Sequence, residues 1–482
     1  MAETRYLDDD IVKLYAAGQP RKPEHLVATL FWGDSVRWLG KGEVEIFRRS
    51  WSQQAGRYQS QRFRCALPPK ARFRPDPLLK VRFIDVGQGD GAMVETPAGK
   101  ILLIDGGEEE HLRRYVNVAF AHVLRTRPLD CAAIVVTHGD ADHFAGLTRL
   151  LEGTRGQGSP MVSSERVFHN GLVKRGSPKR DVEAFGRSVK QDGVTYAVEL
   201  EDDLLQVPDS RMNKPFLAWK AALAGLKKHT KKLAIRRLAY GDDAAFAFLA
   251  EEGVGVRVLG PIVDEVKGKP ALRFLRTPGG GSLSASHTVN GHSIVLKLSF
   301  GNVRFLFGAD LNEESEDRLL ERAGADQLSL AAEVLKVPHH GSADFSPRML
   351  EAIRPVVSVV SSGDENTTKE YIHPRAGLVG ALGKYSRATV EKPLVYVTEM
   401  VAFMERLGTI EARRLTKSGA PAKTAEQVTN AYRKRAFGIV HVRTDGERVL
   451  VATHSGKDEQ KESYAFRVDP SGAIAFEETS VL

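Results

Sequence analysis

The densest group of chemically capable side chains lies in residues 137–143, which read Thr-His-Gly-Asp-Ala-Asp-His. An apolar run over residues 132–136 precedes it, so a buried strand is expected to deliver these side chains into one tight turn. The four ligand-type residues in the turn are His138, Asp140, Asp142 and His143. At this density, four ionisable groups would repel one another or lie unpaired unless a cation bridges them.

Imidazole and carboxylate together suit a divalent ion such as zinc, manganese or iron. The four side chains are too closely spaced for one ion to use all of them, which indicates a pair of adjacent ions. The alternative is a turn whose Asp residues cap the next helix while its histidines lie on the surface. That alternative gives Asp140 a role but leaves the other three residues unexplained.

Further candidate ligands stand where other apolar runs end. Asp310 follows the run 304–307, and its two oxygens could bridge two ions; the alternative role is a cap for the helix expected after Asn312. His339 and His340 follow the run 334–337. Adjacent histidines point in different directions, so one is expected to bind metal and the other to face substrate or support a ligand.

His373, before Pro374, follows the next strand and is a further candidate ligand. His169 is also a candidate, against the alternative of a core or surface histidine.

Other side chains are candidates for supporting roles. Asp105 ends its own strand beside two glycines and is expected to orient a ligand histidine. Asp85 is a second candidate for such a supporting role. Ser342 and Lys336 are candidates for substrate contact. The candidate catalytic groups are Asp142, Asp310 and His340; either Asp142 or Asp310 could take the proton from an attacking water.

The elements that must position these groups fall into three segments. Residues 1–75 form an accessory segment with short strand-like pieces, which ends at a Pro-rich linker. Residues 78–400 alternate long apolar strands with turns and contain a less regular, more charged insertion at about 152–286. Residues 415–482 form a β-rich tail.

Composition excludes some classes of protein. The chain has 482 residues with 42% hydrophobic content, which is ample for a large core. Its two cysteines, Cys65 and Cys131, cannot form a disulfide framework. We find no signal peptide and no run long enough to span a bilayer, so we expect a cytoplasmic protein without a membrane partner.

The net charge of +8 is modest for this length, but its distribution is uneven. The segment 47–75 contains no Asp or Glu, and its basic residues alternate with Phe47, Trp51, Tyr58, Phe63 and Phe73. Basic groups interleaved with aromatics suit phosphate contact and base stacking. The alternative is a β-rich segment with a solvated basic face and a buried aromatic face. A second basic stretch lies on a helix expected over about 215–238, where a solvated helix face is the simpler interpretation.

Six motifs, in order, resemble those of the metallo-β-lactamase superfamily: residues 85–90, 104–107, 137–143, 307–310, 339–342 and 373–374. The closest branch is the soluble hydrolase domain of ComEC-type competence proteins. The resemblance covers about residues 78–400 and implies a four-layer αββα sandwich, here with β-rich N-terminal and C-terminal appendages. It also implies a two-metal site, with zinc expected first and manganese as the alternative. The metals would be held by His138, Asp140, Asp142 and His143 of the turn, by Asp310, by His339 and His340, and by His373.

Two departures from the superfamily pattern matter. Its commonest metal motif has a second histidine where this chain has Asp140, although the competence-type branch shares the aspartate. The membrane channel of the competence proteins is absent, so the resemblance does not imply DNA uptake.

These observations favour a binuclear-metal hydrolase, most simply a phosphodiesterase or nuclease in which a metal-activated hydroxide attacks phosphorus. Its partner would be nucleic acid or a small phosphodiester. The alternative is a small-molecule hydrolase acting on a lactone, an ester or a small phosphodiester. A non-enzymatic metal-stabilised binding module would fit a degenerate motif better than this complete one. Substrate, metal and oligomeric state stay open.

Overall fold

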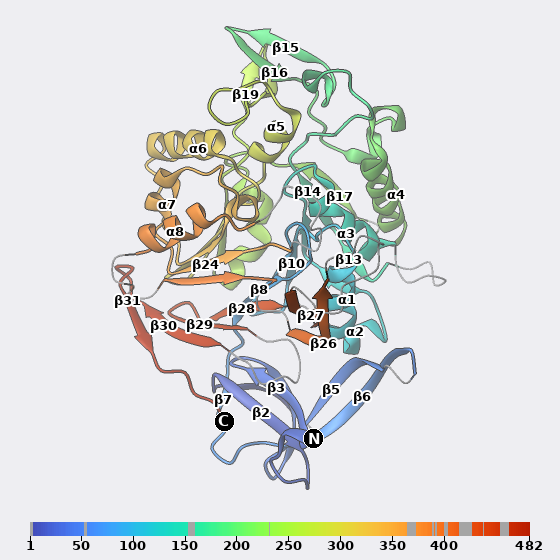
Figure 1. Ribbon diagram of the computed structural model, residues 1–482, viewed down its shortest axis with the longest axis vertical. Helices are drawn as coiled ribbons and strands as arrows, with labels where there is room; N and C mark the ends of the chain where they lie inside the picture. Colours follow the sequence, from blue (N-terminus) through green and yellow to red (C-terminus); the bar gives the residue numbers. More distant parts are fainter. Residues whose placement is uncertain are drawn as a thin grey trace.

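The computed structural model describes residues 3–52, 55–152, 160–230, 232–363, 373–387, 390, 393–399, 403–413, 427–436, 438–453 and 462–482. Two β-sheets pack face to face in the centre of the molecule, and helices cover their outer faces (Figure 1). This helix–sheet–sheet–helix order confirms the αββα sandwich, with further β-structure contributed by both terminal regions.

The first central sheet has ten strands among the described residues. In spatial order they are β17 (Ala234–Arg237), β14 (Arg166–His169), β12 (Ala133–Val135), β10 (Ile101–Ile104), β9 (Ala92–Glu95), β8 (Leu79–Ile84), β28 (Ile439–Thr444), β29 (Arg448–Thr453), β30 (Ser463–Val468) and β31 (Ile474–Glu477). Strands β10, β12, β14 and β17 run parallel to one another. The C-terminal strands continue the sheet because β28 pairs antiparallel with β8.

The second central sheet has six described strands: β18 (Val254–Val258), β21 (Leu296–Phe300), β22 (Val303–Phe307), β23 (Val334–Lys336), β24 (Val357–Val360) and β25 (Leu394–Val397). Strands β22 to β25 are parallel. The segment expected as an insertion thus supplies β14, β17 and β18 to the two sheets. Since parallel strands end at the same edge, the loops after β10, β12, β22 and β23 bring distant parts of the chain together.

Apolar side chains fill three layers. Phe83, Phe305 and Val357 belong to the core between the sheets. Helices α1 (His111–Ala119), α3 (Ala141–Leu151) and α4 (Lys214–His229) pack on the first sheet, where Trp219 is fully buried. Helices α6 (Glu313–Ala325), α7 (Pro347–Ile353) and α8 (Ala376–Tyr385) cover the second sheet. Burial of apolar residues at helical spacing explains why these segments form helices.

The N-terminal region folds as a separate seven-stranded sheet in the order β3-β2-β6-β5-β4-β1-β7. Its strands are β1 (Glu3–Leu7), β2 (Ile11–Ala16), β3 (Leu26–Phe31), β4 (Ser35–Gly40), β5 (Glu43–Ser52), β6 (Arg57–Ala66) and β7 (Phe73–Arg74). It lies at the bottom of Figure 1, below α1, α2 (Ala121–Leu124) and the C-terminal strands. Ile11 and Phe31 pack there against Leu450.

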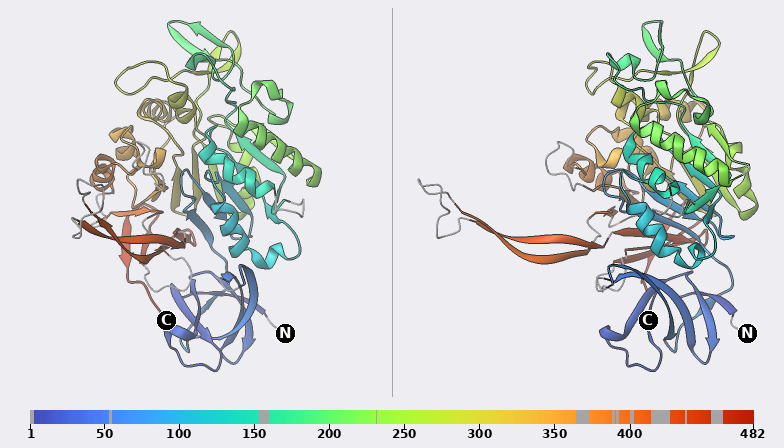
Figure 2. Two further views of the ribbon diagram at one scale, coloured as in Figure 1. Left: turned by 45° about the vertical axis from the view of Figure 1, so that its right-hand side comes forward. Right: turned by 90° about the vertical axis from the view of Figure 1, so that its right-hand side faces the viewer.

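The remaining described strands form smaller sheets. Strands β11 (Leu129–Cys131) and β13 (Val162–Ser164) form a parallel pair. The four-stranded sheet at the top of Figure 1 contains β15 (Ser188–Gln191), β16 (Val194–Ala197), β20 (Lys269–Arg273) and β19 (Asp264–Val266). Strands β26 (Phe403–Ala412) and β27 (Gln427–Ala436) form a hairpin that projects from the body (Figure 2).

The expected basic helix over about 215–238 is shorter than predicted. Helix α4 ends at His229, and Thr230 has extended backbone angles (φ −120°, ψ 100°). Ala234–Arg237 then forms β17, which pairs parallel with β14. The helical prediction was wrong for these residues because the edge of the first sheet offers backbone partners that a sequence pattern does not show. Among the described residues, no helix is long and apolar enough to cross a membrane.

Candidate metal centre

The turn after β12 delivers its side chains as predicted from the apolar run before it. Asp140 has extended backbone angles and precedes the first turn of α3, which places Asp142 and His143 within that turn. Backbone from the loop after β8 lies directly against it. An added Cβ at Gly89 would be 1.7 Å from the carbonyl oxygen of Asp142, and Gly89 has φ +99°, so only glycine fits there.

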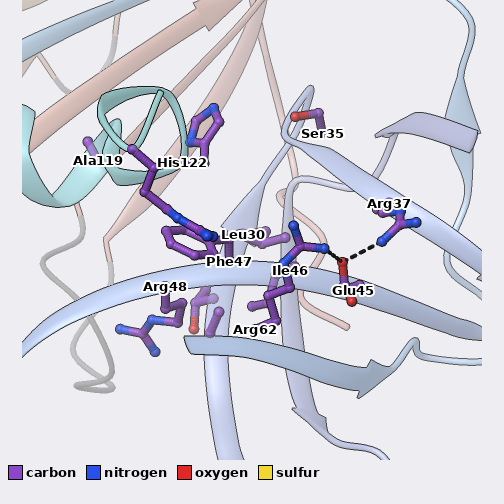
Figure 3. A pocket seen from close by; sticks show the side chains of 13 residues that line it. Leu30, Ser35, Arg37, Glu45, Ile46, Phe47, Arg48, Arg62, Ala119 and His122 are labelled. Carbon is purple, nitrogen blue, oxygen red and sulfur yellow. Dashed lines mark hydrogen bonds and ion pairs between the residues drawn. The ribbon is translucent and has the colours of Figure 1, made fainter. Parts of the chain in front are cut away.

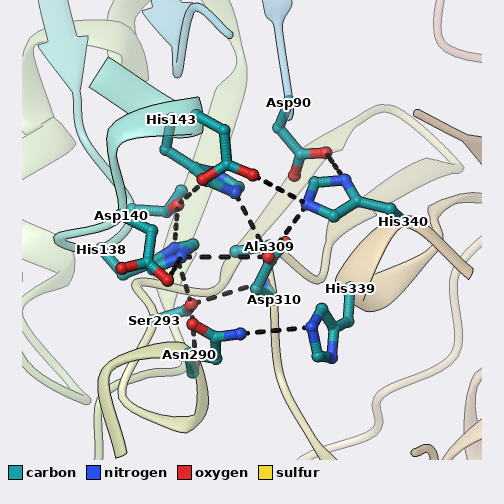
Figure 4. A network of polar contacts seen from close by, with 12 residues as sticks. Asp90, His138, Asp140, His143, Asn290, Ser293, Ala309, Asp310, His339 and His340 are labelled. Carbon is teal, nitrogen blue, oxygen red and sulfur yellow. Dashed lines mark hydrogen bonds and ion pairs between the residues drawn. The ribbon is translucent and has the colours of Figure 1, made fainter. Parts of the chain in front are cut away.

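Three imidazoles converge on one carboxylate at the shared edge of the two sheets (Figure 4). The Nε2 atoms of His340, His143 and His138 lie 3.0, 3.2 and 3.9 Å from Oδ2 of Asp310. The side chains of all four residues are at most 5% exposed. Asp142 lies at the rim, with its Oδ2 3.8 Å from His340 Nε2 and its side chain 22% exposed.

The opposite ring nitrogens of these histidines are held by the protein. His143 Nδ1 lies 2.8 Å from Asp105 Oδ2, and His340 Nδ1 donates to the carbonyl oxygen of Ser361 at 3.0 Å. His138 Nδ1 lies 3.3 Å from the hydroxyl of Ser293. With Nδ1 engaged in this way, each ring turns its Nε2 toward Asp310, which is the arrangement of ligand histidines oriented by hydrogen bonds.

Asp105 is itself firmly held. Its two oxygens accept from the backbone N–H of Thr137 at 2.8 Å and from the Thr137 hydroxyl at 2.6 Å. The expected role of Asp105, orienting a ligand histidine, is consistent with this contact to His143.

Several residues around the cluster have a strained backbone. Asp105, Ala309, His339 and His340 have φ values of 56°, 47°, 47° and 52°, in the left-handed region that non-glycine residues rarely adopt. Such conformations cost on the order of 1–3 kcal/mol each and tend to gather at functional sites. Here the left-handed backbone conformations determine the directions of the side chains that meet at the cluster.

The charges within the cluster depend on one another. Burial alone would raise the pKa of the Asp310 carboxyl, but His340 and His143 hold that pKa well below its usual range. Burial would likewise lower the pKa of His340, but Asp310 and Asp90 raise it to about 10. Burial lowers the pKa of His138 well below its ordinary value. The electrostatic field therefore favours positive charge close to Asp310.

The donors in the cluster fit a divalent metal. Among the described residues, Nε2 of His138, His143 and His340 and Oδ1 of Asp310 are buried without a hydrogen-bond partner. Leaving buried polar atoms unsatisfied is costly, so atoms that share one small volume point to a missing ligand. His138, His143 and Asp310 form one group whose ligand atoms lie within 4.8 Å of one another, and Asp142, His143 and His340 form a second.

Asp140 lies beside these groups, with protein partners of its own. Its Oδ1 is paired with the ammonium group of Lys174, and its Oδ2 lies 3.9 Å from His138 Nε2. In the orientation that satisfies both neighbours, the Asn290 amide donates to Asp140 Oδ2 at 3.0 Å and accepts from His339 Nε2 at 3.2 Å. His339 therefore reaches Asp140 through Asn290.

Lys336 lies on the other side of the cluster. Its buried ammonium group pairs with Asp90, donates to the carbonyl oxygen of Ala309 at 3.0 Å and lies 4.0 Å from Asp310 Oδ1. Asp90 Oδ1 is also 3.2 Å from His340 Nδ1. Lys336, expected as a substrate contact, is here part of the scaffold beneath Asp310.

The other predicted site residues occupy different positions. The His373 ring centroid lies 6.2 Å from that of His339, next to the cluster. His169 lies apart: its Nε2 is 3.1 Å from the carbonyl oxygen of Asp202, and its Nδ1 accepts from the backbone N–H of Gly171. Since both ring nitrogens are engaged, the contacts favour the alternative of a core histidine.

Two further predicted residues organise loops. Asp85 is fully buried and accepts from the backbone N–H of Gly87 at 3.1 Å, which shapes the loop after β8. The hydroxyl of Ser342 accepts from the backbone N–H of Asp344 at 3.2 Å.

Sequence reasoning did not assign a role to Asp90, Lys174, Asn290 or Ser293. Asp90 follows a predicted strand and stands within a quoted motif, so its position at a strand end was an available signal. Lys174, Asn290 and Ser293 have no comparable signal, because Lys174 and Ser293 lie in loops and Asn290 lies on the short helix α5 (Ala285–Gly291).

Comparison with known proteins agrees with this geometry. The family model described as the Metallo-beta-lactamase superfamily matches residues 84–360. A search of the curated proteins finds no match to the chain. The matched region includes every residue of the cluster and ends before His373.

Proposed function

Since this chain belongs to the metallo-β-lactamase superfamily, a family of metal-dependent hydrolases, we propose that it is a phosphodiesterase that cleaves nucleic acid at the cluster around Asp310. The observation that carries the proposal is the convergence of three oriented imidazoles on Asp310. A hydrolase needs its water activated at a fixed place, and a converging donor set provides such a place.

We propose two divalent ions, with zinc expected first and manganese as the alternative. His138, His143 and Asp310 would hold one ion, and Asp142 with His340 would hold the second. Ions bound there would lower the pKa of water and stabilise the negative charge that develops on a phosphoryl oxygen.

The chain's own residues supply orientation and proton transfer. Asp105 and the Ser361 carbonyl keep His143 and His340 turned toward Asp310. Of the two candidates for taking the proton from water, we assign the role to Asp142. Its side chain is 22% exposed, whereas that of Asp310 is 4% exposed. Gln88 Nε2 donates to Asp142 Oδ2 at 3.3 Å and fixes the carboxylate at the rim.

Two observations support nucleic acid as the substrate class. The ordered motifs resemble those of the ComEC-type hydrolase domain, and the acid-free segment 47–75 supplies basic side chains for phosphate contact. The ammonium groups of Lys174 and Lys336 also lie next to the cluster, where they pair with Asp140 and Asp90.

A substrate panel tests the proposal. The purified protein, loaded with zinc or manganese, is assayed on bis(p-nitrophenyl) phosphate, single-stranded and duplex DNA, RNA, a lactone and a thioester, with Asp310→Asn as the control. We expect hydrolysis of phosphodiesters that is lost in the control. Hydrolysis of the lactone or thioester with intact phosphodiesters would instead identify a small-molecule hydrolase.

A further inference from the structure

A cavity of about 480 Å³ lies between the N-terminal sheet and the helices of the catalytic region (Figure 3). Its size falls in the range of small-ligand sites, about 300–1,000 Å³. We call it the arginine pocket. Its polar and aromatic lining comes from strands β4 to β6 and from the α2 region, and includes Arg37, Glu45, Phe47, Arg48, Arg62, His122 and Arg125.

The charges in the arginine pocket do not balance. Arg37 and Arg62 both bind Oε1 of Glu45, at 2.8 and 2.9 Å, so this single carboxylate is shared by two guanidinium groups. Among the residues that the structure describes, Arg48 and Arg125 have no acidic partner. Burial lowers the pKa of Arg48, as expected for a guanidinium group partly removed from water without a counter-charge.

Apart from Glu45, the residues that line the two walls of the pocket include no Asp or Glu. Neither 47–75 nor 111–129 contains an Asp or Glu. The first segment runs through β5 and β6, and the second runs through α1 and α2. Two segments that are distant in the chain and both free of acidic residues therefore face one cavity. An excess of guanidinium groups around a recess is suited to phosphate.

An aromatic ring accompanies the guanidinium groups. The guanidinium carbon of Arg125 lies 5.5 Å from the ring centroid of Phe47. Figure 3 shows Phe47 on the side of β5 that faces His122 of α2, with Arg48 on the other side of the strand. Cationic groups combined with an aromatic platform are the pattern of single-strand binding, in which phosphates contact the cations and an unpaired base stacks on a ring.

We propose that the arginine pocket is an anchoring site for single-stranded nucleic acid, separate from the metal centre. This inference rests on the proposed nuclease function and names where the substrate strand is held. A single nucleotide would fit the cavity, but a strand can also contact the basic side chains that continue along β5 and β6.

The distance between the arginine pocket and the metal centre determines which substrates can contact both sites. Helix α1 begins at His111, whose ring lies next to Gly87 in the loop after β8, and α2 ends at Leu124. The two helices are interrupted at Phe120, so residues 111–124 span at most about 20 Å at the helical rise per residue. A substrate several nucleotides long could occupy both places, whereas a small phosphodiester would use the metal centre alone.

Binding of a fluorescein-labelled single-stranded oligonucleotide to the metal-free protein tests the proposal. We compare wild type with Arg48→Ala/Arg125→Ala and with Arg125→Glu, which alters an exposed side chain and avoids any folding defect from Arg48. The matched control is Lys227→Ala/Lys228→Ala, which removes the same charge from exposed positions on α4. Thermal unfolding checks that each variant is folded.

We expect the pocket variants to bind the strand at least tenfold more weakly and the lysine control to bind within about twofold of wild type. Loss of two phosphate contacts should also flatten the dependence of log K on log salt by about 1.4, at roughly 0.7 per contact for single strands. Equal binding by wild type and the folded pocket variants, or equal weakening in the lysine control, would overturn the proposal. So would a mononucleotide that binds as tightly as the strand.

Activity separates this proposal from the proposed function. If both hold, the pocket variants lose cleavage of the oligonucleotide but hydrolyse bis(p-nitrophenyl) phosphate at the wild-type rate. If the strand binds through the pocket but no phosphodiester is cleaved, the proposed chemistry fails while the anchoring site stands. If cleavage of the oligonucleotide is unaffected by the pocket variants, the anchoring site fails while the proposed chemistry stands.

Discussion

The carboxylate of Asp310 lies at the centre of the candidate metal site. Three histidines from two different sheets direct their Nε2 atoms at it, and each is oriented from behind by the protein. Asp140, although part of the same sequence motif, differs because Lys174 and Asn290 already contact its two oxygens. Residues that share a motif are therefore expected to contribute unequally to metal binding.

Asp310→Asn should lower the metal content of the protein more than Asp140→Asn does. The first change removes the carboxylate common to the histidine contacts, and the second alters a group that Lys174 and Asn290 already stabilise. Metal per chain, measured by mass spectrometry after dialysis, checks this expectation. An Asp140→Asn protein that loses as much metal as Asp310→Asn would show that Asp140 is an equal ligand.

The sequence was sufficient for side chains that follow strands directly. His138, His143 and Asp310 each lie at or just beyond a strand end or its turn, so the apolar run before them indicated where they would meet. Lys174 and Asn290 could not be found in this way because tertiary packing brings them to the cluster, Lys174 from a loop and Asn290 from the short helix α5. His169 ends a strand as well, but its neighbours in space engage both ring nitrogens.

At the scale of elements, α6 shows how packing changes the meaning of a sequence pattern. Its first turn contains Glu313, Glu314 and Glu316. This pattern is typical of a solvent-exposed helix N-terminus, where negative side chains interact favourably with the helix dipole. Packing instead buries Glu316, which is 1% exposed. Burial raises the pKa of its carboxyl to about 8, and the negative charges of Asp344 and Asp317 act in the same direction.

Glu316→Gln should stabilise the protein at alkaline pH. The folded state holds a proton on Glu316 up to about pH 8, whereas the carboxyl in the unfolded chain has its ordinary pKa of 4.5. The free energy of unfolding therefore falls as pH rises between these values. Each pKa unit corresponds to about 1.4 kcal/mol. In measurements from pH 5 to 9, the unfolding temperature of the variant relative to that of wild type should increase as pH rises. A constant difference across this range would contradict the raised pKa.

At the scale of the whole molecule, the two ends of the chain are joined. The buried guanidinium group of Arg443 on β28 binds Asp34 of the N-terminal sheet at 2.9 Å and donates to the carbonyl oxygen of Trp32 at 2.6 Å. Arg448 on β29 binds Asp10 at 2.7 Å. The N-terminal sheet is thus attached to strands that continue the first central sheet, which fixes one wall of the arginine pocket against α2.

Asp34→Ala should destabilise the molecule by about 3–5 kcal/mol, because it leaves the guanidinium group of Arg443, 3% exposed, without its carboxylate. Glu183→Ala is the control, since it breaks the exposed pair with Arg180 and should cost at most about 1 kcal/mol. Unfolding in urea measures both variants. Equal stability of the two would mean that the contact between the sheets contributes little.

The attachment itself could not be read from the sequence. Strand-like segments were predicted in both terminal regions, but such segments do not show which strands pair when they are far apart in the chain. The pairing of β28 with β8 joins residues more than 350 positions apart, and only the packed structure shows it.

The central claim is that divalent metal binds where His138, His143 and His340 meet Asp310. Crystals soaked in manganese and measured above the manganese absorption edge would locate bound ions directly by anomalous scattering. The account predicts anomalous density within ligand distance of Asp310 and of these imidazole Nε2 atoms, and its loss in Asp310→Asn crystals. Anomalous density only at other positions, or none at saturating manganese or zinc, would contradict it.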